Sequence, residues 1–221
     1  MLTRNAEMIR RLLIAIAFSI AFAYIESAVV VYLRAIFYPN GFTFPLAAFD
    51  ATALGKRLLL TEIGREAATL VLIVTAAWLF GRNRQENVAY FLIVFAIWDI
   101  FYYAWLKVLL DWPASLMDWD VLFLMPMVWA SAVLYPVLVS LLMFVFGVAI
   151  LQRNTENRPL VVKSSDWVGW LSAAVIVVFS FCLGGQQISS PNYQDYFHWP
   201  IFAVGFALGG GICARTLRRK A

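Results

Sequence analysis

Charged residues are scarce in this sequence: they make up 14% of its 221 positions, whereas 63% are hydrophobic. Water-soluble domains carry about 25% charged and roughly 45–50% apolar residues. A chain of this size has too little polar surface to cover so much apolar area in water. The shortage of charge therefore excludes a soluble fold. It predicts one integral membrane domain over residues 1–221, with the lipid bilayer as its solvent.

Histidine and cysteine are also scarce, with His198 the one histidine and Cys182 and Cys213 the two cysteines. Zinc and copper sites usually need more of these ligands, and one histidine excludes a haem held by two. The two cysteines fall in different apolar segments, so at ~1.5 Å per helical residue most of the bilayer separates them. We expect no bound metal and no disulfide, and the sequence leaves any cofactor unknown.

Sequence motifs that would identify a reaction are missing as well. The chain has no Gly-x-Ser-x-Gly elbow, no His-Glu-x-x-His pair, no P-loop and no Gly-x-Gly-x-x-Gly turn. No basic face interleaved with stacking aromatics lies outside the apolar segments, which excludes nucleic acid as a partner. The sequence therefore does not decide whether the protein is an enzyme.

Six apolar segments are long enough to cross a bilayer as helices. They are Leu12–Leu33, Leu60–Phe80, Val88–Leu110, Leu122–Leu151, Trp167–Leu183 and Trp199–Leu217. The fourth exceeds the length of a span and contains Pro126 and Pro136. Each proline removes a helical hydrogen bond, so we expect a kinked or tilted helix there. The predicted fold class is all-α: a polytopic bundle of six transmembrane helices.

The first segment resembles a signal peptide, because arginines precede it and Ala21-Phe22-Ala23 looks like a cleavage site. Its apolar run, however, continues through Val31, which is long enough to span. We therefore expect it to be retained as a transmembrane helix.

Lysine and arginine are distributed very unevenly between the two sets of loops. One set holds twelve: Arg4, Arg10, Arg11, Arg82, Arg84, Arg153, Arg158, Lys163, Arg215, Arg218, Arg219 and Lys220. The other holds Arg34, Lys56 and Arg57. Basic residues accumulate in cytoplasmic loops. We therefore predict that both termini are cytoplasmic, in a multi-pass protein of the inner (plasma) membrane.

Ionisable residues also occur inside the predicted spans, where each costs about 2.5–3.5 kcal/mol on insertion scales. They are Glu26, Glu62, Arg65, Glu66, Asp99 and Lys107, all at mid-depth or nearer the outer side. Glu62, Arg65 and Glu66 share one helix face through their i+3 and i+4 spacing. Asp120 and His198 begin the fourth and sixth helices at the same level. These residues predict one pocket that opens to the periplasmic or extracellular side.

Roles follow from the residue types. Carboxylates suit general acid–base chemistry, which makes Glu26, Glu66 and Asp99 the candidate catalytic residues. Cations, aromatic rings and the remaining polar groups suit binding of an amphiphile. The candidate binding residues are Arg65, Tyr103, Lys107, Asp120, His198 and Trp199. A quinone or a lipid head group fits this pocket, so the leading hypothesis is a protein that binds or acts on a lipid-soluble molecule.

Two alternatives explain the same residues. The charges could form a salt-bridge network that only fixes helix packing, in a non-catalytic subunit of a larger membrane complex (a respiratory one, for example) with membrane-protein partners. The chain could also be a small solute transporter. The aromatic segments Phe37–Phe49, Asp111–Asp120 and Tyr193–Pro200 suit either an interfacial belt or a lid over a cavity.

The predicted orientation can be tested with topology reporters. A reporter that works only in the cytoplasm should be active between Arg153 and Lys163 or after Ala221, because the basic loops remain inside. A reporter that works only after export should be active at Asn192. A cytoplasmic Asn192 would reverse the orientation and move the candidate site to the other face.

Overall fold

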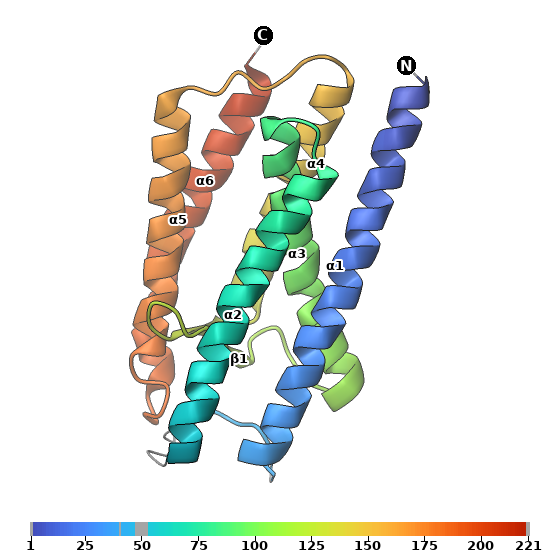
Figure 1. Ribbon diagram of the computed structural model, residues 1–221. Coiled ribbons are helices and arrows are strands. Elements are labelled where there is room, and N and C mark those ends of the chain that lie inside the picture. The colour runs from blue at the N-terminus through green and yellow to red at the C-terminus, as the bar shows by residue number, and fades with distance from the viewer. Residues whose placement is uncertain (1, 40, 47–52, 220–221) are drawn as a thin grey trace.

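Six long helices dominate the computed structural model of the chain, which describes residues 2–39, 41–46 and 53–219 (Figure 1). The helices are α1 (Leu2–Phe37), α2 (Ala53–Phe80), α3 (Arg84–Leu110), α4 (Leu134–Thr155), α5 (Ser164–Gly185) and α6 (Trp199–Arg218). A hairpin of β1 (Trp119–Phe123) and β2 (Trp129–Ala132) precedes α4, and the short 3-10 helix η1 (Tyr193–Tyr196) precedes α6. Lys220, Ala221 and positions 40 and 47–49 of the first aromatic segment lie outside the described residues.

All six helices are long and apolar enough to cross a membrane. This confirms the predicted fold class, an all-α multi-pass membrane protein. The first described residue of α1 and the last of α6 lie at the same end of the bundle, which we call the terminal end (Figure 1). The opposite end, where the hairpin lies, is the hairpin end. Which side of the membrane each end faces remains a prediction.

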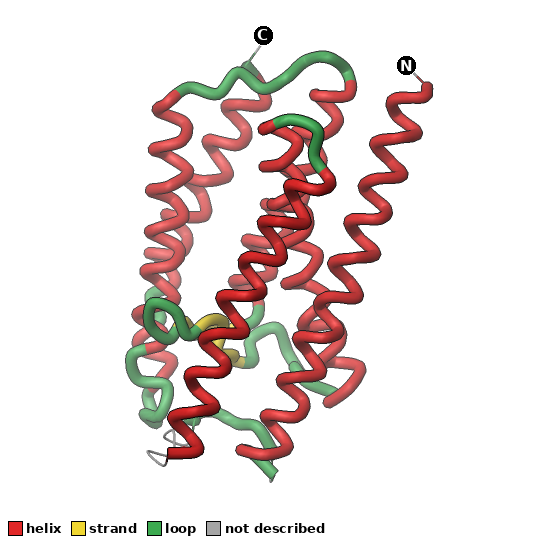
Figure 2. Tube along the Cα trace, viewed as in Figure 1, coloured by secondary structure: helices red, strands yellow, loops and turns green. Residues whose placement is uncertain are grey.

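The fourth predicted span was wrong in its first half. Residues 119–132 form the antiparallel hairpin, in which Trp119 pairs with Ala132 and Val121 with Ala130, and the helix begins only at Leu134. Pro126 lies at the tip between the strands, since proline lacks the N–H that a helix needs there and favours an extended residue before it. In Figure 2 the hairpin lies among the helices, behind the lower half of α2, and Trp119, Asp120, Ala130, Ser131 and Ala132 are buried. Non-helical backbone is tolerated at such a depth only where protein surrounds it.

Helix α3 lies at the centre of a group formed by α1, α2, α3 and α4. Its start is fixed by Asn83, whose side-chain oxygen accepts the N–H groups of Gln85 and Glu86, 3.0 Å away in each case. Side chains also join it to α1: the Trp105 indole N–H donates to the Ile20 carbonyl at 3.0 Å. Residues of α3 therefore have fixed positions relative to three neighbouring helices.

Helices α5 and α6 pack closely on each other and make few contacts with the other four helices. At the terminal end, the fully buried Asp166 accepts hydrogen bonds from Arg215 at 2.6 Å and Arg219 at 2.7 Å. From α4, Arg153 donates to the backbone carbonyls of Leu217 and Arg219. Between the ends, α4 also touches α5, where the Phe146 and Trp170 ring centroids lie 5.5 Å apart, and α6, where a Cβ on Gly210 would lie 3.8 Å from Leu142.

At the hairpin end, close backbone approach holds α5 against the hairpin. A Cβ atom placed on Gly184 would lie 2.1 Å from the Ala130 carbonyl oxygen, and one on Gly185 would lie 1.8 Å from that of Val128. Only glycine permits this approach. The two glycines therefore position the hairpin across the end of the space between the helix groups.

The glycine contact predicts a large difference between two alanine variants. Gly184→Ala should destabilise the protein by about 1–3 kcal/mol, because the added methyl group overlaps a carbonyl that cannot move away easily. Gly211→Ala is the matched control, since a Cβ there meets nothing within 4 Å. Thermal melting in detergent measures both. Equal melting temperatures for the two variants would contradict the contact.

Candidate functional site

The space between the two helix groups is a cavity of about 1100 Å³. All six helices and the hairpin contribute to its wall. It extends from Arg84 and Gln85, near the terminal end, to Tyr103 and Asp120 beside the hairpin. From Arg84 to Tyr103 along α3 this is about 28 Å at the helical rise of 1.5 Å per residue, close to the ~30 Å thickness of the hydrocarbon core.

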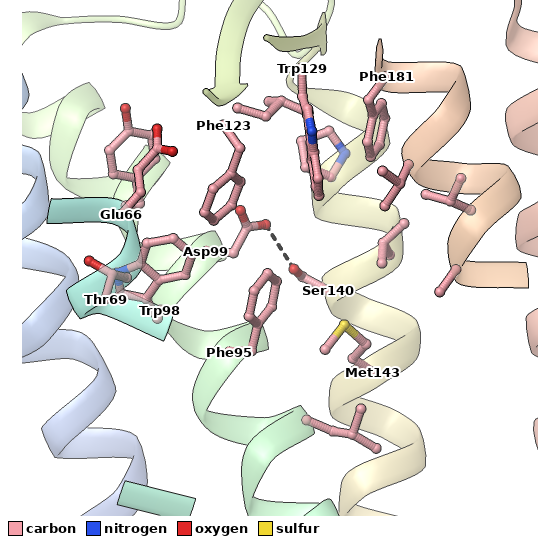
Figure 3. Close-up of a pocket in the computed structure, with 18 of the residues that line it drawn as sticks. Glu66, Thr69, Phe95, Trp98, Asp99, Phe123, Trp129, Ser140, Met143 and Phe181 are labelled. Atoms are coloured by element: carbon pink, nitrogen blue, oxygen red, sulfur yellow. Dashed lines mark hydrogen bonds between the residues drawn. The ribbon is translucent and has the colours of Figure 1, made fainter. Parts of the chain in front are cut away.

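The wall of the cavity is mainly apolar and is especially rich in aromatic rings. Rings from α3, the hairpin and α5 surround its middle part, where Phe95, Trp98, Phe123, Trp129 and Phe181 are found (Figure 3). Several of these rings contact one another, with centroids 5.3 Å apart for Phe123 and Trp129. Such a surface suits an apolar, partly planar guest.

Asp99 is the polar group in the middle of this aromatic wall. Its Oδ2 accepts a hydrogen bond from the Ser140 hydroxyl of α4 at 2.8 Å (Figure 3). Among the described residues, no lysine or arginine lies within ion-pair distance of it, and its Oδ1 has no hydrogen-bond partner. A carboxyl group in a low-dielectric site without such a partner is costly.

Glu26, Glu62 and Arg65 form an ion-pair cluster between α1 and α2. The Arg65 guanidinium binds Glu26 on α1 and also Glu62, one turn before it on α2, at 2.8 Å. Thr69 donates a further hydrogen bond to Glu26 at 2.9 Å. All four line the cavity. Arg65 therefore pairs with Glu26 and Glu62 and not with Asp99.

Glu66 has a different neighbour, the backbone of the hairpin loop. Both of its carboxylate oxygens accept the Leu124 N–H, at 3.0 and 3.1 Å. Residue 124 follows β1, where the loop leaves the ladder and its N–H would otherwise lack an acceptor. The side chain lines the cavity and is 7% exposed. Glu66 thus joins α2 to the hairpin.

Arg34, near the end of α1, is held between two aromatic rings and a carboxylate. Its guanidinium carbon lies 3.8 Å from the centroids of both Phe42 and Trp112, and its Nη2 lies 3.5 Å from Asp120 on β1. The Tyr103 hydroxyl approaches the same carboxylate. The cluster closes the hairpin end of the cavity.

The structure therefore brings together six of the nine sequence-predicted site residues. The residues in the cavity wall are Glu26, Arg65, Glu66, Asp99, Tyr103 and Asp120. The three that do not line it are Lys107, His198 and Trp199. What those six do chemically remains a proposal, because geometry alone does not assign a role.

Lys107 was expected to point into the bundle, and this was wrong. Its side chain is half exposed and pairs with Asp111 at 2.7 Å, one turn further along the chain. The ammonium group lowers the pKa of the Asp111 carboxyl. Helical rotation explains the difference: Tyr103 and Leu106 take the buried face at this level, so the next residue turns outward.

His198 and Trp199 lie at the start of α6, on the surface, and Trp199 is 62% exposed. Helix α6 contributes to the cavity further along, through Gly205, Phe206 and Gly209. The sequence marked the residues that begin α6, but it could not show that this helix lines the cavity only from Gly205 onward.

Sequence reasoning missed Ser140 and underrated Arg34. Ser140 is an isolated serine in an apolar stretch of α4, and nothing in its spacing links it to Asp99. Arg34 was counted as a loop charge. The aromatic segments that contain Phe42 and Trp112 could have indicated otherwise, because arginine commonly stacks on aromatic rings.

Comparisons with known proteins do not identify the site, because no protein-family model, curated protein or solved structure matches the chain. Within residues 2–39, 41–46 and 53–219, no group of three or more His, Cys, Asp or Glu side chains is arranged to hold a metal ion. The site must therefore be interpreted from its own geometry.

The Arg65 cluster predicts a specific pattern of stability. Arg65→Gln should cost about 3–5 kcal/mol, because it leaves two carboxylates within the bundle without their cation. Adding Glu26→Gln should recover part of the loss. Lys107→Gln is the control and should change the melting temperature little, since that pair is exposed. If the double variant were no more stable than Arg65→Gln, the Arg65–Glu26 ion pair would not contribute to stability.

Proposed function

We propose that the cavity binds a lipid-soluble molecule whose polar group contacts Asp99 and whose apolar body lies along the aromatic wall. The observation that carries this proposal is the environment of Asp99: a carboxyl group facing a large apolar cavity, with the Ser140 hydroxyl as its described partner. The other cavity carboxylates have structural partners, namely Arg65 for Glu26 and Glu62, the hairpin backbone for Glu66, and Arg34 for Asp120.

Three indole groups of the cavity wall support the same proposal. The side chains of Trp98, Trp129 and Trp170 line the cavity, and their Nε1–H groups are buried without a hydrogen-bond partner in the described part of the chain. Buried donors are normally paired, so unpaired ones call for an unseen acceptor. A guest molecule with polar atoms, or water that enters with it, supplies one.

A route from the bilayer also favours a lipid-soluble guest. Leu171 of α5 lines the cavity and is 64% exposed. We propose that the guest enters from the bilayer beside this part of α5. A molecule dissolved in the bilayer can enter there without crossing water, which suits a quinone or a lipid with a polar head.

This geometry separates the proposal from its alternatives. A subunit whose charges serve only helix packing needs its carboxylates paired and its core filled, and neither holds around Asp99. Glu26 and Glu66, the other two candidate catalytic residues, have structural partners, so we assign them to shaping the wall. We further propose an inner-membrane location, with the hairpin end on the periplasmic or extracellular side, because the basic loops lie at the terminal end.

Asp99→Asn tests the proposal. Protein purified in a mild detergent should carry a non-protein molecule, detected by native mass spectrometry, and the variant should lose it. Its melting temperature should stay the same or rise, because functional carboxylates are commonly held at a cost in stability. A large fall in melting temperature with the molecule still bound would make Asp99 a structural residue.

Filling the cavity provides an independent version of this test. Met143→Trp replaces a flexible thioether with a bulky indole in the space beside Ser140, and it should prevent binding of the molecule (Figure 3). Leu141→Trp, on the same helix but 47% exposed toward lipid, is the matched control and should retain it. Retention by both variants would show that the molecule lies elsewhere.

A further inference from the structure

Acidic side chains outnumber basic ones in the half of the cavity wall that is nearer the hairpin. Five carboxyl groups lie there, those of Glu26, Glu62, Glu66, Asp99 and Asp120. Two cations, Arg34 and Arg65, lie among them. Arg84 lines the opposite end, roughly 22 Å from Asp99 along α3 at 1.5 Å per residue. Within the described residues the polar half of the cavity therefore has a surplus of three acids.

Neither of the two cations is available to a guest. Arg65 is held by Glu26 and Glu62, and Arg34 by Asp120 and two aromatic rings. In the hairpin half of the cavity, an anionic head such as a phosphate would find no free cation among the described residues and would face Glu66 and Asp99. Arg84, the third arginine of the wall, lies at the opposite end, so the charge pattern around Asp99 disfavours anionic lipids and quinones bearing acidic groups.

The chain itself shows how it holds a cation. Arg34 lies 3.8 Å from the centroids of two rings, with a carboxylate 3.5 Å from the guanidinium. Aromatic faces and a carboxylate are the groups that bind organic cations in partly apolar sites. The surroundings of Asp99 repeat this combination: Phe95, Trp98 and Phe123 lie beside the carboxyl group (Figure 3). Here no described side chain supplies the cation.

From this complementarity we infer that the cavity selects lipophilic organic cations, such as amphiphilic amines or quaternary ammonium compounds, with Asp99 as the counter-ion. The inference rests on the proposed function, since it names the class of molecule for the same site. An amine-bearing lipid and a free lipophilic cation share this chemistry. The carboxylate attracts the charge, and the rings of the wall cover the apolar groups around it.

Two ions of nearly equal size and opposite charge test the inference. Tetraphenylphosphonium and tetraphenylborate differ in charge but hardly in shape. Equilibrium dialysis against the full-length protein in a neutral maltoside detergent should show at least tenfold tighter binding of the phosphonium. Asp99→Asn should abolish that preference and Asp99→Glu should keep most of it. Lys107→Gln, a change outside the cavity, should leave it unchanged.

Competition then separates the two sources of cation. If phosphatidylethanolamine displaces the phosphonium and phosphatidylglycerol does not, the guest is an amine-bearing lipid. No displacement by either identifies a free lipophilic cation. Each outcome supports the inferred class.

The failures of the inference and of the proposed function are distinguishable. If tetraphenylborate binds as tightly as the phosphonium, or more tightly, and Met143→Trp abolishes this binding, the cavity remains a binding site. The cation inference is then overturned. The same holds if the phosphonium preference survives in a folded Asp99→Asn protein. If neither ion binds and no molecule is retained in purification, both the inference and the proposed function fail.

Discussion

Every polar group inside a bilayer must find its partner within the protein, because lipid offers none. Most features of this structure follow from that constraint. The non-helical hairpin is possible at its depth because its backbone is paired across the strands and, at Leu124, with Glu66. The arginines on α1 and α2 that line the cavity each have carboxylate partners. Among the described carboxyl groups of the cavity, Asp99 is the one with neither a cation nor a backbone N–H as its partner.

The division of the helices into two sets explains why the Asp99 carboxyl group can remain without an ionic partner. Helices α1 to α4 pack around α3, whereas α5 and α6 join them chiefly through Asp166 and Arg153 at one end and through Gly184 and Gly185 at the other. Between these ends α4 touches α5 and α6, and the cavity remains open beside α3. A bundle packed along its whole length would bury Asp99 against apolar side chains, at a cost of several kcal/mol. The cavity and the carboxyl group are therefore parts of one arrangement.

The sequence predicted the elements that depend on composition. Six spans followed from apolar length, and the depth of Glu26, Glu66 and Asp99 followed from their places within those spans. It failed where long-range packing decides. The stretch Leu122–Val133 is apolar enough for a helix, but Pro126 and pairing with the opposite strand make part of it a hairpin. Lys107 lies at the expected depth and turns outward, because depth does not fix rotation. Contacts such as Ser140 with Asp99 join distant segments, and no local pattern encodes them.

The central claim, that Asp99 faces a cavity occupied by a guest molecule, is tested most directly by an experimental density map of the protein in lipid nanodiscs. The account predicts non-protein density beside the Asp99 carboxyl group and Ser140, extending along the aromatic wall toward Phe181. A map in which α5 and α6 close against α3 and α4, leaving no room and no density beside Asp99, would contradict it.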